Sequence, residues 1–233
     1  MKSSNAAPAE ERTREPQYQL HVDLRDKVGF ERFGLMINEA WIQDPKRVLF
    51  VLSRYKFVAK MLSGKKNVLE IGCADAFGTR LVQQEVKSVT AVDFDPVFIA
   101  DAEDRATARW PLVTRVHDLL SGPVDGDFDA AYALDVLEHI QPDNEPAFMD
   151  NAVGSLDTHG VLMIGLPSLE SQAYASPQSR EGHVNCKTGP ALRALMERYF
   201  HNVFVFSMND EIVHTGFQPL AHYLFAIGCG KRV

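Results

Sequence analysis

The sequence predicts an α/β fold built on a doubly wound, seven-stranded sheet, mostly parallel but with an antiparallel final strand, and preceded by N-terminal helices. Three observations indicate this. Short apolar segments alternate with helical ones, the first apolar segment runs into Gly72, and the second ends at Asp93. Strands alternating with helices form parallel βαβ units. Of the 233 residues, 45 % are hydrophobic, which is enough to build the core of one such domain.

Three regions are expected along the chain. Residues 1–19 are polar and charged, lack the apolar stretch of a signal peptide, and are expected to form a flexible tail. Residues 20–64 are expected to form a helical cap, because apolar residues recur at three- and four-residue spacings from 30 to 62. Residues 65–233 are expected to form the α/β domain, in which 168–188 and 207–222 are long polar loops.

Within the α/β domain, the strands are short and apolar, and the helices between them are amphipathic. Asp95 and Pro96 begin one helix, since aspartate caps a helix and proline fits its first turn. No helical crossover pattern separates the last two strands, which favours an antiparallel pair. The expected strands lie within 67–71, 86–94, 112–117, 128–134, 160–166, 203–206 and 223–227, and the expected helices at 78–85, from 95, 145–156 and 190–200.

Charge and cysteine content exclude several classes of protein. The net charge of -7 does not suit a surface for phosphate backbones, so no nucleic-acid partner is expected. The three cysteines are far apart and form no CxxC pair, which favours reduced thiols in a cytoplasmic protein over disulfides or a zinc knuckle. No apolar run approaches the roughly 20 residues that span a bilayer, so no membrane partner is expected.

The segment after the first strand has the composition of a nucleoside-binding loop. Gly72 permits a sharp turn, and Gly78 lets the next helix start close to the sheet. Asp93 follows Gly72 by 21 residues, and a carboxylate there can accept hydrogen bonds from both ribose hydroxyls. A dinucleotide site would have glycine where Phe77 stands. The acidic residues flanking the loop instead suit a cationic ligand such as S-adenosylmethionine (SAM).

Five segments in order resemble the motifs of the class I SAM-dependent methyltransferases. They are VLEIGCADAFG (68–78), VTAVDFDP (89–96), HDL (117–119), FDAAYALDVLEHI (128–140) and LDTHGVLMIGLP (156–167). The resemblance implies a Rossmann-like fold with SAM as cofactor. The chain departs from the family at Ala74 and Ala76, where glycines are usual. By position, the resemblance implies cofactor contacts from Glu70, Gly72, Ala74, Gly78, Asp93, Phe94, Asp118, Leu119, Leu134 and Tyr55. It also implies that Asp135 lines the path toward the methyl group. Arg54 is an alternative to Tyr55 as the residue that contacts the SAM carboxylate.

The candidates for proton transfer follow the fourth strand or lie in the two polar loops. In related natural-product enzymes a Glu-His pair at the position of Glu138 and His139 acts as an acid/base dyad, although in many relatives it is structural. His183 and His214 are the other candidate bases. Glu211 and His214 could present two metal ligands, but no third ligand is evident, so no metal is expected.

The expected function is O-methylation of a small polar acceptor by SAM. The C-terminal segment is similar to methyltransferases of surface-polysaccharide pathways, which implies a sugar or a phosphate- or phosphoramidate-type acceptor in surface-glycan or natural-product biosynthesis. Arg180, His183 and Lys187 could receive an anionic acceptor. The alternatives are N-methylation, or a non-catalytic SAM-binding protein, for which Ala74 and Ala76 are the only support. A nicotinamide-dependent oxidoreductase is disfavoured by Phe77 and by the short chain beyond Pro167, and the oligomeric state is open.

Overall fold

A computed structural model describes residues 11–232, and the chain divides into two compact units between Phe33 and Gly34. In the first unit a short 3-10 helix (Pro16–Tyr18) leads into α1 (Gln19–Val28), none of whose residues is buried. Of the predicted tail, residues 1–10 lie outside the described residues, and the chain is helical from residue 16. The second unit holds the sheet and all remaining helices.

Two N-terminal helices belong to the same unit as the sheet. α2 (Leu35–Gln43) and α3 (Lys46–Met61) are separated at Asp44 and Pro45. The helical pattern predicted from residue 30 therefore begins at Leu35. α3 buries Val58 and Ala59 in a cluster that includes residues of β1, β4 and β8, so this helix is a layer of the domain.

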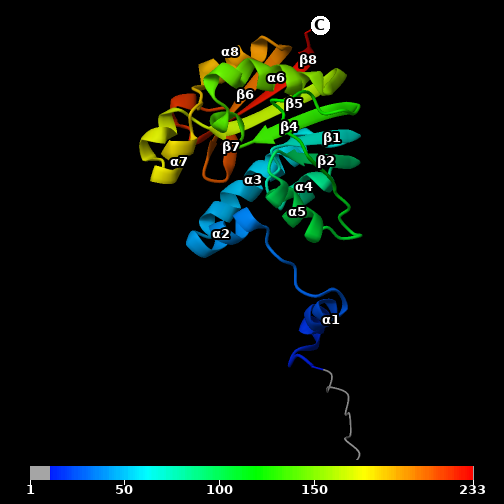
Figure 1. Ribbon diagram of the computed structural model, residues 1–233. Helices are drawn as coiled ribbons and strands as arrows, with labels where there is room; N and C mark the ends of the chain where they lie inside the picture. Colours follow the sequence, from blue (N-terminus) through cyan, green and yellow to red (C-terminus); the bar gives the residue numbers. More distant parts are fainter. Residues whose placement is uncertain (1–10, 233) are drawn as a thin grey trace, which may run out of the picture. The chain divides into compact units, whose positions relative to one another are not determined.

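The sheet has eight strands in the order β3-β2-β1-β4-β5-β8-β6-β7 (Figure 1). The doubly wound α/β class is confirmed, including an antiparallel last strand: β8 pairs antiparallel with both β5 and β6. β7 is an addition to the seven predicted strands and lies within the segment 207–222 expected to be a loop. The strands are β1 (Asn67–Ile71), β2 (Ser88–Asp93), β3 (Val113–Val116), β4 (Phe128–Leu134), β5 (Leu156–Pro167), β6 (Phe200–Asn209), β7 (Ile212–His214) and β8 (Tyr223–Lys231).

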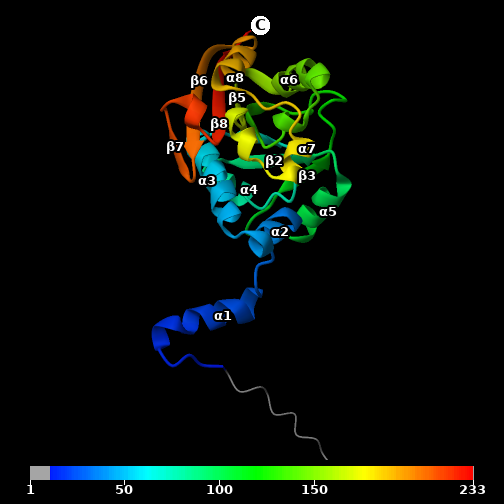
Figure 2. The same cartoon turned by 90° about the vertical axis from the view of Figure 1, so that its left-hand side faces the viewer.

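Helices cover both faces of the sheet (Figures 1 and 2). α6 (Glu145–Gly154) and α8 (Gly189–Glu197) bury Phe148, Met149 and Met196 against one face. α3, α4 (Thr79–Gln83) and α5 (Pro96–Asp104) cover the other. Asp95 caps α5 as predicted, accepting a hydrogen bond from the Val97 backbone N–H at 2.8 Å. Within residues 11–232, no helix is long and apolar enough to cross a membrane.

The strand order reverses between β1 and β4, which are parallel neighbours at the centre of the sheet. The helices that follow these two strands lie on opposite faces of the sheet. In open α/β sheets, ligands bind at such a switch point, beyond the carboxyl ends of the strands. The loop after β1 includes Gly72 to Gly78, and the segment after β4 contains a short 3-10 helix (Leu137–His139). The predicted cofactor and catalytic residues are concentrated at this edge.

Candidate active site

The loop after β1 is built from left-handed residues at alternate positions. Gly72 has a φ of 69°, and Ala74 and Ala76 adopt the same region at 45° and 50°. A Cβ on Gly72 would lie 2.4 Å from a methyl carbon of Val136 in the segment after β4, so glycine is needed for the two loops to approach. The alanines thus hold a backbone shape that glycine adopts more easily.

Asp93 at the end of β2 holds this loop in place. One oxygen of its carboxylate accepts the Ala74 backbone N–H at 2.8 Å, and the other accepts the N–H of Asp95 at 2.9 Å. A carboxylate oxygen has two lone pairs, so both oxygens can still accept a ribose hydroxyl. The neighbouring residue Phe94 is 72 % exposed, so its side chain is accessible to a flat base. Loop support by Asp93 was not predicted.

Glu70 is buried under the loop and does not reach its surface. It is 1 % exposed, and its oxygens accept hydrogen bonds from the hydroxyls of Tyr55 on α3 (2.8 Å) and Thr79 on α4. Burial raises the pKa of Glu70 to about 7. A Cβ on Gly78 would lie 2.3 Å from the Tyr55 ring. These contacts fix α3, α4 and β1 together, so Glu70, Tyr55 and Gly78 position the loop.

Asp75, expected to attract a cationic ligand, caps a helix instead. Its carboxylate accepts the backbone N–H groups of Met36 (2.9 Å) and Ile37 (3.0 Å) at the start of α2. A Cβ on Gly34 would overlap this carboxylate at 2.4 Å, which explains the glycine before the helix. Gly34 was the sequence signal for this contact, but it lies 41 residues from Asp75, so their meeting depends on the fold.

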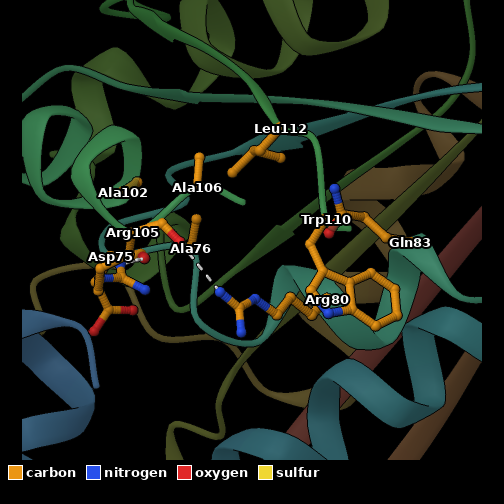
Figure 3. A pocket seen from close by; sticks show the side chains of 9 residues that line it. All are labelled: Asp75, Ala76, Arg80, Gln83, Ala102, Arg105, Ala106, Trp110 and Leu112. Atoms are coloured by element: carbon orange, nitrogen blue, oxygen red, sulfur yellow. Dashed lines mark hydrogen bonds between the residues drawn. The ribbon is translucent and has the colours of Figure 1, made fainter. Parts of the chain in front are cut away.

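A small pocket of about 20 Å³ adjoins the loop between α4 and α5 (Figure 3). Asp75 and Ala76 belong to its lining, and α4, α5 and the segment after α5 contribute further lining residues, among them Arg80, Arg105 and Trp110. The Arg105 guanidinium donates to the Asp75 carbonyl oxygen, and Arg80 donates to the Arg105 carbonyl at 3.3 Å. This volume suits about one water and is far too small for a nucleoside. The residues that line this pocket therefore support the loop, and the pocket itself does not hold the nucleoside.

The predicted adenine segment lies beside Asp93. The His117 backbone N–H donates to the Asp93 carbonyl oxygen at 2.8 Å, which places the residues after β3 next to the tip of β2. Asp118 is exposed and accepts the Leu120 backbone N–H at 2.9 Å, while Leu119 is buried. The carboxylate of Asp118 is thus available to a ligand at this edge, as the predicted contact with the adenine amine requires.

The end of β4 carries an ion pair. Asp135 has a left-handed φ of 56°, and its two carboxylate oxygens accept hydrogen bonds from Arg54 at 2.7 and 2.9 Å. The Arg54 guanidinium carbon also lies 4.0 Å from the centroid of the Tyr223 ring on β8. Leu134 is buried in the core at this point. Arg54, predicted as an alternative contact to the SAM carboxylate, instead joins α3, β4 and β8.

Three predicted proton-transfer residues come together just beyond this ion pair. One ligand atom each of Glu138, His139 and His183 lies within 4.8 Å of the other two, and the two imidazole centroids are 5.2 Å apart. The Glu138 carbonyl oxygen accepts the N–H groups of Val184 (2.8 Å) and Asn185 (3.0 Å). These bonds hold the loop after α7 (Pro177–Gly182) against the 3-10 helix, and so bring His183 to the pair.

Glu138 is the unusual member of this group of three, which we call the Glu-His-His cluster. Its side chain is completely buried, and neither carboxylate oxygen has a hydrogen-bond partner. Burial, together with the nearby negative charge of Asp135, raises the pKa of Glu138 well above its ordinary value. Burial also lowers the pKa of His183, with the proximity of His139 as the next cause. A carboxyl group without partners is costly to bury.

The other polar candidates do not join the cluster. The β6–β7 hairpin uses both ring nitrogens of His214: one accepts the Gly216 N–H at 2.9 Å, and the other lies 2.9 Å from the Asn209 side-chain oxygen. Lys187 pairs with Glu145 at 2.5 Å, and Arg180 donates to the Ala173 carbonyl oxygen at 3.0 Å. Base function for His214 and an anion site at Arg180 and Lys187 stay predictions, and these contacts give them no support.

Comparison with known proteins agrees with the motif assignment. Residues 68–160 match the family described as a methyltransferase domain. A probable SAM-dependent methyltransferase of Mycolicibacterium smegmatis is 27 % identical over 116 residues, which are 49 % of this chain and 42 % of that protein. The chain spans less than half the length of the curated relatives it matches. The comparisons support the predicted class: residues 68–160 match a methyltransferase domain, and the curated relatives are named as probable SAM-dependent methyltransferases.

Solved structures confirm the fold. The N-methyltransferase NodS from Bradyrhizobium japonicum WM9 superposes with a TM-score of 0.59 at 21 % identity, covering 82 % of this chain and 99 % of NodS. The structure of DhpI in complex with S-adenosylhomocysteine (SAH) superposes with a TM-score of 0.61 at 16 % identity, covering 84 % of this chain and 92 % of DhpI. At these identities the likeness concerns the fold.

Proposed function

We propose that the chain binds SAM over the loop after β1 and transfers its methyl group to a small polar acceptor held at the Glu-His-His cluster. The main supporting observation is the Asp93 carboxylate at the end of β2, which holds the left-handed loop after β1 next to the switch point of the sheet. Phe94 and Asp118 lie next to it, where the adenine of SAM would extend. The names of the matched relatives support SAM as the cofactor.

The preferred acceptor group is a hydroxyl, on a sugar or a comparable small molecule. A bond forms between the acceptor oxygen and the methyl carbon, the carbon–sulfur bond breaks with its electron pair moving to sulfur, and the hydroxyl proton leaves. His139, which is exposed, and His183, which is half-buried, are the candidate groups to receive that proton. Holding the oxygen in line with the methyl group can contribute about 7 kcal/mol or more to catalysis.

The alternative, a SAM-binding protein without turnover, was based only on Ala74 and Ala76, and the conformations of these two residues do not favour it. Ala74 and Ala76 adopt the backbone region that glycine favours at alternate positions of a tight loop, and the Ala74 N–H is held by Asp93. The replacements therefore change the side chains by one methyl group each and leave the left-handed turns in place. N-methylation, the reaction named for NodS, is the close variant that product analysis distinguishes.

Two measurements test the proposal. SAH should bind one site per chain in calorimetry. Asp93→Ala should weaken it about tenfold or more, because hydrogen bonds to a charged acceptor contribute about 1.5–3 kcal/mol. Asp157→Ala, which changes an exposed carboxylate on β5, is the control and should leave the affinity unchanged. Unaltered affinity in Asp93→Ala would refute the site. Labelled SAM with sugar and amine panels then reports the acceptor class, and failure to label any acceptor despite tight SAH binding would favour a non-catalytic protein.

A further inference from the structure

The Glu-His-His cluster has the donor set of a transition-metal site. Two imidazole nitrogens and one carboxylate oxygen are ligands that Zn²⁺, Mn²⁺ and Fe²⁺ accept, and two histidines with one glutamate leave a coordination position open. The three ligand atoms lie within 4.8 Å of one another. Bonds of about 2.1 Å would set them about 3.4 Å apart in a tetrahedral site, so small side-chain rotations close the site.

Hydrogen bonds already orient both imidazoles as ligands. The Nδ1 of His139 lies 2.9 Å from the Gly182 carbonyl oxygen, and the Nδ1 of His183 lies 2.9 Å from the Oε1 of Gln172. The Gln172 amide nitrogen donates to the Ser168 carbonyl, which fixes the oxygen toward His183. Since these oxygens only accept, each Nδ1 carries a proton, and in the neutral form of each ring Nε2 is the atom left to bind a metal. Metal-binding histidines are typically oriented in this way.

The buried carboxylate supplies the second, independent observation. Neither oxygen of Glu138 has a partner, although the side chain is completely buried. Arg54 lies nearby, but its guanidinium donates to both oxygens of Asp135. A cation between Glu138 and the imidazoles would satisfy the carboxylate, and the exposed His139 side chain provides the way in from solvent.

We propose that Glu138, His139 and His183 bind one divalent transition-metal ion, with an open position for the oxygen of the methyl acceptor. This chemical role rests on the proposed function, whereas metal binding itself does not. In the metal-bound protein the imidazoles are ligands, the acceptor hydroxyl binds the cation through its oxygen, and its proton passes to solvent water. The sequence suggested no metal because its best pair, Glu211 and His214, lacked a third ligand.

Metal binding is tested on the untagged full chain, stripped with a chelator and titrated with Zn²⁺ in calorimetry without nucleoside. One equivalent should bind, and Co²⁺ should give a visible absorption band that Zn²⁺ abolishes. Glu138→Gln, His139→Gln and His183→Gln should each weaken Zn²⁺ binding about 100-fold, and Gln172→Ala about tenfold through the lost bond to His183. His159→Gln removes an exposed imidazole on β5 and should bind as the wild type does.

The outcomes separate this inference from the proposed function. The metal site is overturned, even if SAH binds, by either of two results. One is that the wild type does not bind Zn²⁺ stoichiometrically. The other is that all three ligand variants bind Zn²⁺ with the affinity of the wild type. Zn²⁺ binding that the variants abolish upholds the site even if SAH does not bind. Zn²⁺ should also raise the melting temperature of the wild type but not of Glu138→Gln. This comparison still tests the site if the variant is too unstable for calorimetry.

Discussion

Replacing Ala74 by glycine is expected to stabilise the protein. A left-handed backbone costs an L-residue roughly 1–2 kcal/mol relative to its ordinary conformations, and Ala74 has a φ of 45°. Glycine removes that cost but gains freedom in the unfolded chain, which offsets about 0.4–1 kcal/mol. The half-buried methyl group of Ala74 belongs to none of the apolar core clusters. The net gain is therefore about 0.5–1 kcal/mol in the free energy of unfolding.

Ala76 provides the internal comparison, because its φ of 50° is similar but its methyl group is buried with Ala91 and Ile99. Losing that methyl costs about 0.8 kcal/mol, so Ala76→Gly should change stability little. Ala91→Gly, in the regular strand β2, should destabilise by about 1–2 kcal/mol. Equilibrium urea unfolding measures all three variants. A loss of stability in Ala74→Gly as large as that in Ala91→Gly would refute the argument that the loop is strained.

Three further changes probe the groups that hold the site together. Burial raises the pKa of Glu70 from 4.5 to about 7, so the folded protein keeps a proton that the unfolded chain releases. The resulting stability is complete below pH 4.5 and is lost as the pH rises through about 7, a change of about 3 kcal/mol that Glu70→Gln should abolish in urea unfolding between pH 4.5 and 8. Gly78→Ala places a methyl group against the Tyr55 ring and should cost about 1–3 kcal/mol in the same assay; unchanged stability would contradict the contact. Arg54→Met removes the partner of the half-exposed Asp135 and should lower the free energy of unfolding by about 1–2 kcal/mol, whereas Arg47→Met, at the exposed pair with Glu39, should change it by less than about 0.5 kcal/mol.

The sheet and its cofactor edge were predictable because their signals are local. Apolar segments bounded by turn residues marked the strands, and the loop at Gly72 together with Asp93 marked the edge of the sheet at which a cofactor is expected. The strand β7 was missed because it is three residues long and lies in a polar segment. Its signal was the turn at Asn209 and Asp210, where Asp210 adopts a φ of 50°, followed by the β-branched Ile212 and Val213.

The contacts that assemble the site were beyond sequence reasoning because they join distant segments. Asp75 and the start of α2 are 38 to 39 residues apart. His183 reaches Glu138 only because the carbonyl oxygen of Glu138 binds two backbone N–H groups of the loop after α7. Single residues suggested chemistry in each case, but their partners depend on how the chain is folded.

Strained backbone is concentrated where this fold binds its ligands. Four non-glycine residues in the described part of the chain have positive φ, and three of them, Ala74, Ala76 and Asp135, lie after β1 or β4 at the switch point. Such conformations persist only where the surroundings over-determine them. Here Asp93 holds Ala74, and Arg54 holds Asp135. The two loops at the switch point are thus held in these strained conformations by side chains from other elements of the chain.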